Sequence, residues 1–526
     1  MARGGAAAAR GGLRPAFALG SSPVRALASR AGLKFTSSIF DIDEITMKDT
    51  TEQVVKGGRH LFSKLPQALD GVKQIGVIGW GSQGPAQAQN IRESLEGSGV
   101  RVKVGLRPGS SSMDQARAVG FDESNGTLGE MYSVISESDM VLCLISDGAC
   151  ATEYPKIFKA LKPGTTFGLS HGFLLGHLES IGETFPSDVN VVLVAPKGMG
   201  PSVRRLYELG REVNGSGINA SFAVHQDVNG KATDHALAWA VGVGSPYIFQ
   251  TTLSSEYRSD IFGERCILLG AVHGIIESLF RRYEANGMTP EAAFTNSSEV
   301  ITGPLTQTIS HEGIKAVYDK MSGEDRETFK RAYLASYMPA RGIIEECYDS
   351  VSSGNEIRDV CMAVDRFDRY PMGELDGTRT WQIGKKVRKA AGTPEQRKQT
   401  PVHAFSAGVY CATMMAQIDT LVDHGHVYSE VVNESVIESV DSLNPYMHAR
   451  GVSYMVDNCS VTARLGSRKW APRFDYALTE QAYTAIDTGA KLDEKLFDEF
   501  LNHPIHQCIA ECAKMRPSVD ISLPDE

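Results

Sequence analysis

The apolar residues in the first half of the chain gather in short runs that predict the strands of one sheet. Such runs lie at residues 73–79, 100–106, 140–145, 165–169 and 190–195, and helical stretches separate them. Strands that alternate with helices along the chain are typical of a doubly wound parallel sheet. We therefore expect an α/β domain in this half.

The pattern changes after about residue 251, where long helical periodicities replace the strands and glycine loops become scarce. Residues 261–283 are predicted to form one long, mostly apolar helix, and residues 407–422 form a second. A weak internal repeat relates the two parts of this half, because residues 313–322 parallel residues 451–460. The second half is therefore expected to be all-helical and built from two related copies.

Two acidic pairs stand on apolar helical stretches of this half. Asp260 and Glu264 are four residues apart, and Glu434 and Glu438 have the same spacing. In a helix each pair projects from one face, one turn apart, and apart from Arg265 no cationic partner is visible near the first pair. Four carboxylates that face one another across a helical core would suit one or two hard divalent cations, above all Mg²⁺. The alternative is that each pair belongs to a solvated face.

The internal repeat supports a single shared site. Lys398 and Val402 occupy the places in the second copy that correspond to the first acidic pair, and neither is acidic. Conversely, Glu434 has no acidic counterpart at Thr295 or its neighbour in the first copy. The two copies thus hold complementary halves of one carboxylate site.

A glycine motif follows directly after the first strand. It matches G-x-G-x-x-G, with a strand before it and a helix that begins near Pro85, and its residues are Gly79, Trp80, Gly81, Ser82, Gln83 and Gly84. Gly79 permits the tight turn, Gly81 lets a pyrophosphate approach, and Gly84 allows the helix to pack closely on the strand. The pyrophosphate would rest on the free N–H groups of the helix N-terminus. This predicts a Rossmann dinucleotide-binding domain.

The end of the strand at 100–106 predicts which dinucleotide binds. An NAD site would carry Asp or Glu there, but this chain has Arg107, Ser110 and Ser112 within Arg-Pro-Gly-Ser-Ser-Ser. A guanidinium and several hydroxyls suit a 2′-phosphate. NADPH is therefore the expected cofactor, and a basic surface turn is the alternative.

Polar residues also close the later strands. Ser146 and Asp147 end one strand where the nicotinamide half of the cofactor usually lies, and His171 and Lys197 end two others. We expect these four residues in the site; for His171 and Lys197 the alternative is an ordinary surface residue on a loop. Residues 168–172 also match the hydrolase pattern G-x-S-x-G, but they follow a dinucleotide motif, which argues against a nucleophile at Ser170.

Composition limits the class of protein. With 526 residues the chain is too long for one ordinary core, so two or three domains are expected. The contents of 42% hydrophobic and 22% charged residues are those of a soluble globular protein, and the net charge of -10 argues against a nucleic-acid partner. No apolar run approaches the roughly 20 residues that a membrane span needs. The nine cysteines are scattered and are expected to be reduced thiols.

The first forty residues have a different composition. No acidic residue precedes Asp41, and Ala, Gly and Ser alternate with Arg3, Arg10, Arg14, Arg25 and Arg30. This is typical of a transit peptide, with the mature chain beginning near Phe35, and a retained basic tail is the alternative. Composition does not separate a plastid from a mitochondrion.

The chain resembles ketol-acid reductoisomerases, also called acetohydroxyacid isomeroreductases, of the long plant type. The motifs that carry the resemblance lie at residues 78–87, 169–177, 259–265, 433–438 and 456–460, and it extends from about Phe35 to the end. The family fold implied is a Rossmann domain with a parallel sheet, followed by an all-α, deeply knotted region of two duplicated helical domains. The expected organisation is a transit peptide at 1–35, an arm at 36–54, the NADP-binding domain at 55–251 and helical domains at 252–398 and 399–526.

The resemblance also implies roles for individual residues. Asp260 resembles the carboxylate that bridges two Mg²⁺ ions, and Glu264 resembles a ligand of the first ion. Glu434 and Glu438 resemble partners of the second ion. Ser460 resembles the hydroxyl that touches the substrate carboxylate, and His171 and Lys197 resemble polar groups near the metals and the nicotinamide. The chain departs from many plant members at two positions, which often have Lys in place of Pro108 and Gln in place of Cys150.

The reaction implied has two steps: a metal-assisted alkyl migration in 2-acetolactate or 2-aceto-2-hydroxybutyrate, then reduction by NADPH. It belongs to valine, leucine and isoleucine biosynthesis and predicts a chloroplast location, with the mitochondrion second. A homo-oligomer, dimer or tetramer, is expected, without nucleic-acid or membrane partners. The alternatives are an NADP-dependent hydroxyacid dehydrogenase that needs no metal and a non-catalytic NADP sensor.

Overall fold

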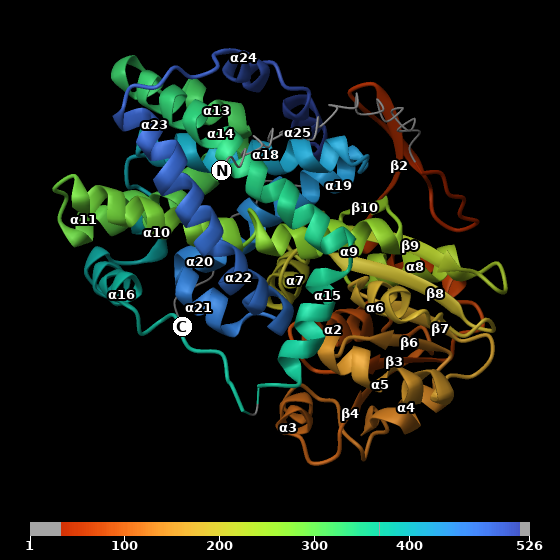
Figure 1. The fold of residues 1–526 in the computed structure, drawn as a ribbon. Helices are drawn as coiled ribbons and strands as arrows, with labels where there is room; N and C mark the ends of the chain where they lie inside the picture. The colour runs from red at the N-terminus through yellow and green to blue at the C-terminus, as the bar shows by residue number, and fades with distance from the viewer. Residues whose placement is uncertain (1–32, 368, 516–526) are drawn as a thin grey trace, which may run out of the picture.

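The computed structural model describes residues 33–367 and 369–515. The leader predicted over residues 1–35 lies outside the described residues except for its last three positions. Figure 1 shows an α/β part, red to yellow, beside a larger mass of helices, green to blue. The two parts therefore follow the order in which the sequence pattern changes from strands to helices.

The α/β part is built on one ten-stranded sheet with the order β1-β2-β10-β9-β8-β7-β6-β3-β4-β5. The strands are β1 (Asp43–Met47), β2 (Thr50–Lys56), β3 (Gln74–Ile78), β4 (Arg101–Leu106), β5 (Leu128–Glu130), β6 (Met140–Cys143), β7 (Thr166–Leu169), β8 (Asn190–Pro196), β9 (Ala220–Gln226) and β10 (Tyr247–Gln250). From β5 through β4, β3, β6 and β7 to β8 all neighbours are parallel. The order reverses between β3 and β6, as in a Rossmann sheet.

The five predicted strands correspond to β3, β4, β6, β7 and β8, and their apolar runs have a simple cause. Successive residues of a strand point to opposite faces of the sheet. In β8, Val191 and Leu193 join one hydrophobic core, whereas Val192 and Val194 join another. Because both faces are covered, every position must be apolar, and the strands read as continuous runs.

Helices cover both faces of the sheet. The helical segments of this part are η1 (Arg59–Lys64), α1 (Leu65–Ala68), α2 (Gln83–Ser94), α3 (Ser111–Ala118), α4 (Met131–Glu137), α5 (Asp147–Ala160), α6 (Phe173–Ile181), α7 (Gly200–Leu209) and α8 (Ala232–Gly242). Apolar residues of α2 and α8 enter the core on one face, and those of α4, α5 and α6 enter the core on the other. The second core continues into the helical region, so the two parts share one hydrophobic interior.

The segment predicted as an arm, residues 36–54, holds most of a β-hairpin, residues 43–56, that extends the sheet. Strand β2 pairs with β10, and β1 pairs with β2, in both cases antiparallel. The carboxylate of Glu52, which is 5% exposed, accepts hydrogen bonds from the backbone N–H groups of Tyr428 and Ser429 at 2.7 and 3.1 Å. The hairpin therefore ties the sheet edge to the helical region.

The helical region repeats itself at a constant spacing. Its segments are α9 (Leu253–Arg265), α10 (Gly270–Ala285), α11 (Pro290–Phe294), η2 (Thr295–Glu299), η3 (Ile301–Leu305), α12 (Thr306–Glu312), α13 (Ile314–Asp319), α14 (Gly323–Ser352), α15 (Asn355–Val364), α16 (Arg379–Ala391), α17 (Pro394–Arg397), α18 (Ala404–Asp423), α19 (Tyr428–Val432), η4 (Asn433–Ile437), η5 (Ser439–Leu443), α20 (Asn444–Arg450), α21 (Val452–Asn458), α22 (Val461–Ala477), η6 (Leu478–Tyr483), α23 (Thr484–Asp487), α24 (Lys495–Leu501) and α25 (Ile505–Ala513). The run from α11 to α13 recurs as α19 to α21, and α14 recurs as α22, each time with the same difference in residue number as between 295 and 433.

The two copies interlock. Helix α10 of the first copy packs along α22 of the second, and α18 of the second packs along α14 of the first. Glycines make both crossings close: a Cβ at Gly274 would lie 2.4 Å from the carbonyl oxygen of Ala471, and one at Gly408 would lie 2.5 Å from that of Phe329. Neither copy can therefore bury its long helix without the other.

One helix prediction was wrong. Residues 261–283 form two helices, because α9 ends at Arg265 and α10 begins at Gly270. The chain folds back so tightly between them that a Cβ at Gly270 would lie 2.1 Å from the carbonyl oxygen of Arg265. Residues 266–269 are all buried, and an apolar buried turn cannot be told from an apolar helix by composition. The prediction for 407–422 is confirmed by α18.

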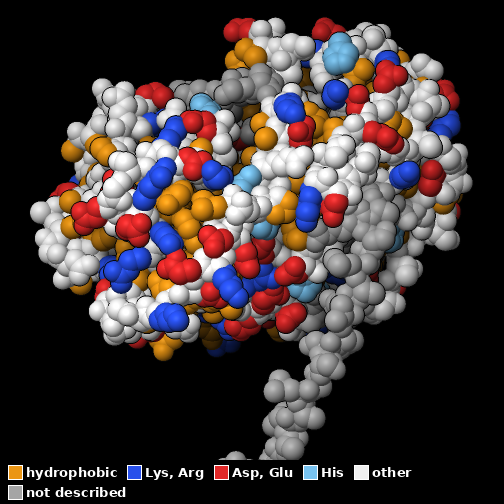
Figure 2. All heavy atoms as spheres, turned by 90° about the horizontal axis from the view of Figure 1, so that it is seen from above, with side chains coloured by type: hydrophobic (Ala, Val, Ile, Leu, Met, Phe, Trp, Pro, Cys, Tyr) orange, Lys and Arg blue, Asp and Glu red, His pale blue; other side chains and the backbone are white. Residues whose placement is uncertain are grey.

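The distribution of charge over the surface can be followed on one face of the molecule. On the face that Figure 2 shows, acidic and basic side chains are interspersed, with hydrophobic side chains between them. Among the helices of the described residues, none combines the length and the apolar character that a membrane crossing requires.

Candidate active site

Many of the predicted site residues meet at the carboxyl edge of the parallel sheet. A cavity of about 1100 Å³ lies there, walled by loops after β3, β6, β7 and β8 on one side and by α9, η5, α21 and α22 on the other. Parallel strands all end at the same edge, which explains why segments far apart in sequence converge on one cavity. Gly81, Ser146, His171, Asp260 and Ser460 all belong to its wall.

The glycine motif has the geometry that its three glycines predict. Gly79 has a φ of 107°, and a Cβ there would lie 2.6 Å from the carbonyl oxygen of Leu144. Gly81 has open space where a Cβ would stand, which leaves room for a close-lying pyrophosphate. A Cβ at Gly84 would lie 2.3 Å from the carbonyl oxygen of Gly79, so α2 packs closely on the strand end. Ser82 and Gln83 line the cavity, whereas Trp80 is buried against Phe121.

The residues predicted to choose NADPH lie after β4, the neighbour of β3. Arg107 is exposed, and Ser112 stands in the first turn of α3. Ser110 occupies the N-cap position of that helix without a side-chain capping bond, and its hydroxyl is buried without a hydrogen-bond partner among the described residues. These residues lie outside the wall of the main cavity, so their contact with a cofactor stays a prediction.

Three of the four predicted carboxylates lie together. Oxygens of Asp260, from α9, and of Glu434 and Glu438, from the π-helical segment η4 and its end, are within 4.8 Å of one another. One oxygen each of Glu434 and Glu438 is buried and accepts no hydrogen bond from the described residues. Orphaned, converging carboxylate oxygens are the donor set that a hard divalent cation takes.

Burial and mutual repulsion disfavour the charged form of Glu434 and Glu438, and their pKa values are raised. Burial, then the charge of Asp260, raises the pKa of Glu434 to about 8, although Lys197 acts against the shift. Burial and the charges of Glu434 and Asp260 raise the pKa of Glu438 well above its usual value. Like-charged carboxylates therefore stay partly protonated near neutral pH unless a cation joins them.

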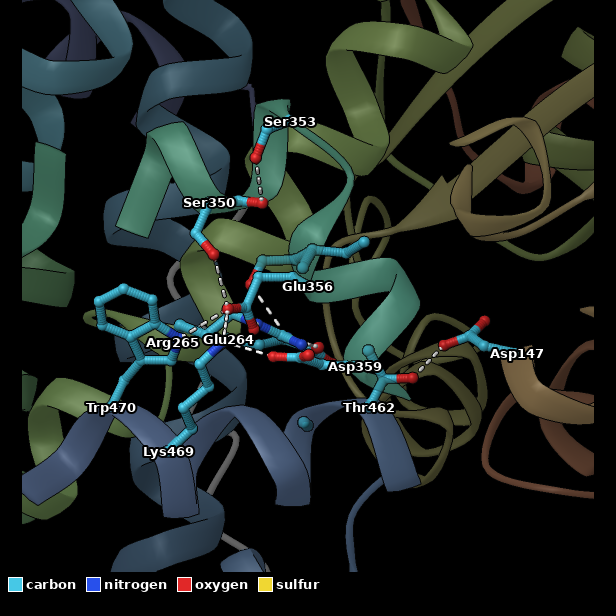
Figure 3. Close-up of polar contacts among 12 residues, drawn as sticks. Asp147, Glu264, Arg265, Ser350, Ser353, Glu356, Asp359, Thr462, Lys469 and Trp470 are labelled. Carbon is cyan, nitrogen blue, oxygen red and sulfur yellow. Dashed lines mark hydrogen bonds and ion pairs between the residues drawn. The ribbon is translucent and has the colours of Figure 1, made fainter. Parts of the chain in front are cut away.

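Glu264 lies apart from this group. It lines the same cavity, but its carboxylate is 3.2 Å from the Nη1 atom of Arg265 (Figure 3). Arg265 in turn donates to the buried Glu356 at 2.8 Å, which also accepts from Lys469 at 2.5 Å. Burial and the charge of Asp260 raise the pKa of Glu264 to about 8. Glu264 was predicted to lie beside the other three carboxylates; it shares their cavity but does not belong to their close group.

Lys197 compensates the acidic group from the end of β8. It is 1% exposed and contacts Glu434, and its Nζ atom is 3.6 Å from the carboxylate of Glu256. Burial alone would lower the pKa of Lys197, but Glu434 and Glu256 hold it well above its usual value. The Oε2 atom of Glu256 accepts from the N–H of Gly172 at 2.7 Å, which fixes the loop that carries His171.

The sequence reasoning missed Glu256, although a signal was present. Glu256 precedes Asp260 by four residues, so it extends the acidic face of α9 by one turn toward the N-terminus. Burial raises the pKa of Glu256 to about 7, although Lys197 acts in the opposite direction.

His171 lies between two carboxylates. Its Nδ1 atom is 3.1 Å from Oδ1 of Asp147, and its Nε2 atom is 3.2 Å from Oδ2 of Asp260. Burial alone would lower the pKa of His171, but the charges of Asp147 and Asp260 hold it well above its usual value. The ring is therefore oriented from both sides beside the acidic group.

Asp147 has partners that the cofactor prediction did not anticipate. Its second oxygen accepts from the hydroxyl of Thr462 at 2.5 Å, in the first turn of α22 (Figure 3). Asp147 thus joins the α/β part to the helical region and orients His171, while Ser146 beside it lines the cavity. A residue at the end of a strand can bind a cofactor or can orient another side chain. Position in the sequence alone therefore did not tell which of these two roles Asp147 has.

Ser460 stands at the start of α22, on the cavity wall. Its hydroxyl oxygen accepts the N–H of Ala463 at 3.0 Å and so caps the helix. A hydroxyl that accepts one bond can still donate its own proton, and for Ser460 no acceptor for that proton is found in the part of the chain that the structure describes. The structure thus places Ser460 where a substrate could reach it.

The matching half-site of the first copy is closed. Glu299, within a residue of the place that corresponds to Glu438, accepts hydrogen bonds at 2.9 Å from both Arg388 and Arg397. Glu299 and Arg397 are buried. Guanidinium groups thus compensate this carboxylate, whereas Glu438 in the second copy lines the cavity.

Comparison with known proteins finds close relatives. The family model "Acetohydroxy acid isomeroreductase, NADPH-binding domain" matches residues 69–247, and "Ketol-acid reductoisomerase, C-terminal domain" matches residues 253–392 and 403–503. "Ketol-acid reductoisomerase, chloroplastic" of Spinacia oleracea is 56% identical over 511 residues, which cover 96% of this chain and 85% of that protein. The protein of the same name from Pisum sativum is 56% identical over 526 residues, or 98% and 90% of the two chains.

A solved structure agrees with the fold. An "NADH-preferring ketol-acid reductoisomerase from an uncultured archean" superposes with a TM-score of 0.51 and 24% sequence identity, covering 60% of this chain and 94% of that chain. At this identity the likeness concerns the fold.

Proposed function

The chain belongs to the ketol-acid reductoisomerase family, and from that premise we propose how its site carries out the reaction. It is an oxidoreductase with isomerase activity that acts on a small 2-aceto-2-hydroxy acid and uses NAD(P)H. In 2-acetolactate or 2-aceto-2-hydroxybutyrate an alkyl group migrates between neighbouring carbons, and the new 2-keto group is reduced to give a 2,3-dihydroxy acid. The product leads to valine, leucine and isoleucine.

We infer that Asp260, Glu434 and Glu438 hold the cations of the first step, with Glu264 as a further ligand. The observation that carries this inference is the group of three carboxylates with orphaned oxygens, which suits two Mg²⁺ ions better than a site for hydride transfer alone. When bound, the cations polarise the ketone and lower the pKa of the substrate hydroxyl. The residues supply fixed oxygens on two packed helical segments, so little reorganisation is needed.

The neighbouring polar residues orient the substrate and adjust the local charge. Lys197 compensates part of the acidic charge through Glu434 and Glu256, which keeps the carboxylates in place. His171 is held by Asp147 and is near enough to the acidic group to exchange a proton with a substrate hydroxyl. We assign Ser460, whose hydroxyl proton is free, to the substrate carboxylate.

We propose that the hydride comes from NADPH. The open space at Gly81 and the start of α2 would receive the pyrophosphate, while Ser146 lies at the nicotinamide end of the cavity. Arg107, with Ser110 and Ser112, would bind the 2′-phosphate, because a guanidinium and hydroxyls match its charge and donors. The buried hydroxyl of Ser110, which has no hydrogen-bond partner within residues 33–367 and 369–515, supports this assignment.

The test is NADPH oxidation that depends on 2-acetolactate, measured with Mg²⁺ and with a chelator. The proposal expects turnover with Mg²⁺ and none once the cation is removed, because the migration must precede reduction. Turnover that survives the chelator would instead favour a metal-free hydroxyacid dehydrogenase. Absence of turnover with Mg²⁺ present would reject the proposed reaction.

We also propose plastid import. The relatives from Spinacia oleracea and Pisum sativum carry the word "chloroplastic" in their names. Removal of the leader near residue 35 would leave Phe35, whose ring packs against Phe222 at 4.9 Å, close to the new terminus. A reporter fused to residues 1–40 should enter plastids, and a cytosolic reporter would contradict the proposal.

The remaining expectations concern organisation. We propose domains at 55–251, 252–398 and 399–526, supported by the change from sheet to helices and by the repeat. We further propose a dimer or tetramer, which light scattering of the purified protein would test.

A further inference from the structure

Two cysteines stand close together in the wall of the cavity. The sulfur atoms of Cys143 and Cys150 are 3.8 Å apart, and both side chains are 5% exposed. Cys143 is the last residue of β6, and Cys150 lies in the first turn of α5. Both residues contribute to the wall of the active-site cavity, so a small molecule that enters the cavity can reach them.

We propose that Cys143 and Cys150 are an oxidation site that forms an intramolecular disulfide and thereby switches the active site off. A disulfide needs sulfur atoms about 2 Å apart, so the pair must close by roughly 1.8 Å. Such a pair, seven residues apart across one strand-to-helix connection, needs only a shift of that connection. The disulfide does not depend on the proposed reaction, whereas the loss of activity does.

The connection between the cysteines holds parts of the site on both sides. Its backbone at Leu144 and Ile145 lies so close to Gly79 that a Cβ there would be 2.6 to 2.8 Å away, which leaves no slack beside the glycine motif. Asp147, further along the connection, orients His171 and binds Thr462. Movement of the connection therefore reaches the cofactor side and the metal side together.

The far side of the connection is equally confined. A Cβ at Gly148 would lie 2.7 Å from the side chain of Val364 on α15, so the start of α5 abuts the helical region. A shift needed to close the disulfide cannot be absorbed by empty space there. Misplacement of catalytic groups by about 1 Å can cost roughly 100-fold in rate. We expect turnover by the oxidised protein to be about 10- to 100-fold slower than turnover by the reduced protein.

The oxidant that fits is a small peroxide. One sulfur attacks a peroxide oxygen, the O–O bond breaks, and one water leaves as a sulfenic acid forms. The second sulfur then attacks the sulfenic sulfur, the S–O bond breaks, and a second water leaves with the remaining thiol proton. The two thiols lose two electrons in total and hydrogen peroxide gains them. A dithiol reductant reverses the step by thiol–disulfide exchange.

The surroundings of the two thiols determine how fast they are oxidised. The neighbouring Cys143 thiol, then burial, raises the pKa of Cys150 well above its usual value, so oxidation is expected to be slow. Bound NADPH would fill the cavity and shield the pair. The experiment therefore uses the cofactor-free protein and follows a time course.

The experiment treats the reduced, full-length mature protein with hydrogen peroxide, removes the peroxide, and alkylates the remaining thiols. Trypsin leaves both cysteines on the peptide of residues 118–156, since neither Lys nor Arg occurs between Arg117 and Lys156. The disulfide appears as an unalkylated peptide that is lighter by two hydrogen atoms. A second cleavage before Asp147 must leave its two parts joined until dithiothreitol is added. NADPH binding and turnover are measured on the same samples.

Three variants complete the test, each compared with its own reduced state. In Cys143→Ser and Cys150→Ser, peroxide should cause no loss of turnover that dithiothreitol can reverse. If Cys150→Ser does not fold, Cys150→Ala takes its place. Cys459→Ser is the matched control, because Cys459 is another thiol of the cavity wall, and it should lose and regain turnover like the unmodified protein. Full alkylation of the 118–156 peptide after inactivation, or a reversible loss in Cys143→Ser, would overturn the proposal. Disulfide formation with altered NADPH binding but no turnover in the reduced protein would reject the proposed reaction instead.

Discussion

Replacing Asp147 with Asn separates two roles that this carboxylate could have. In the structure it binds the Nδ1 atom of His171 at 3.1 Å and the hydroxyl of Thr462 at 2.5 Å, and its side chain is 17% exposed. Asn keeps the shape but removes the charge that His171 faces. If Asp147 positions His171, Asp147→Asn should lower kcat with 2-acetolactate and leave KM for NADPH nearly unchanged.

The expected size follows from the hydrogen bond that is weakened. Hydrogen bonds to charged groups contribute about 1.5 to 3 kcal/mol. With about 1.4 kcal/mol for each factor of ten, kcat should fall by about 10- to 150-fold. Little of this is lost to solvent screening, because both side chains are largely buried.

Thr462→Val is the matched control, since it removes the second hydrogen bond of Asp147 and keeps the β-branched shape. It should cost less than Asp147→Asn, because the contact with His171 remains. Equal losses in both variants would mean that Asp147 acts only as a clasp between the two parts of the chain. A rise in KM for NADPH with kcat intact would refute the positioning role and restore the predicted role in cofactor binding.

Four further predictions concern the cofactor and the metals. Arg107→Asp should narrow or reverse the preference for NADPH over NADH, because the 2′-phosphate loses a charged partner and meets a carboxylate; equal kcat/KM for both cofactors in the unmodified protein would contradict it. Mg²⁺ affinity, followed by calorimetry, should increase from pH 6 to pH 8, because carboxylates such as Glu434 and Glu264, with pKa values of about 8, must release protons on binding. An Mg²⁺ affinity independent of pH would count against buried ligands. For the same reason the metal-free protein should lose stability as the pH rises from about 4.5 to 8, because in this range the unfolded state has released these protons and the folded state still holds them. Glu438→Gln should slow turnover of 2-acetolactate more than reduction of 3-hydroxy-3-methyl-2-ketobutyrate, the migrated intermediate, because reduction needs only one polarising cation; equal losses would reject this division.

The Rossmann core was predictable because its physics is local. Strands buried on both faces must be apolar throughout, as Val191 to Val194 show, and the glycine motif needs its three glycines for reasons of backbone geometry. Strands β1, β2, β5, β9 and β10 were not predicted. Strands β2 and β10 are short or mixed in pattern, and their extended conformation depends on pairing with neighbours: β2 pairs with β1 and β10, and β10 pairs with β2 and β9. The break between α9 and α10 depends on the close approach of Gly270 to Arg265, which no periodicity reveals.

The site was predictable to the extent that helical spacing determines it. The spacing of four and the internal repeat predicted that carboxylates of distant segments would face one another, and Asp260, Glu434 and Glu438 do so. Glu264 departs because Arg265 competes for it, and that competition depends on the position of Glu356, far away in sequence. Spacing identifies a face of a helix, but the partners of that face are known only once the chain is folded.

The central claim is that the carboxylate group around Asp260 binds the cations on which both steps depend. The most direct measurement is NADPH oxidation by Asp260→Asn at saturating Mg²⁺, with 2-acetolactate and with 3-hydroxy-3-methyl-2-ketobutyrate as separate substrates. Asp325→Asn, at an exposed position in the first turn of α14, is the matched control. The account predicts that Asp260→Asn is inactive with both substrates while the control keeps its activity. A fully active Asp260→Asn protein would contradict the metal site itself.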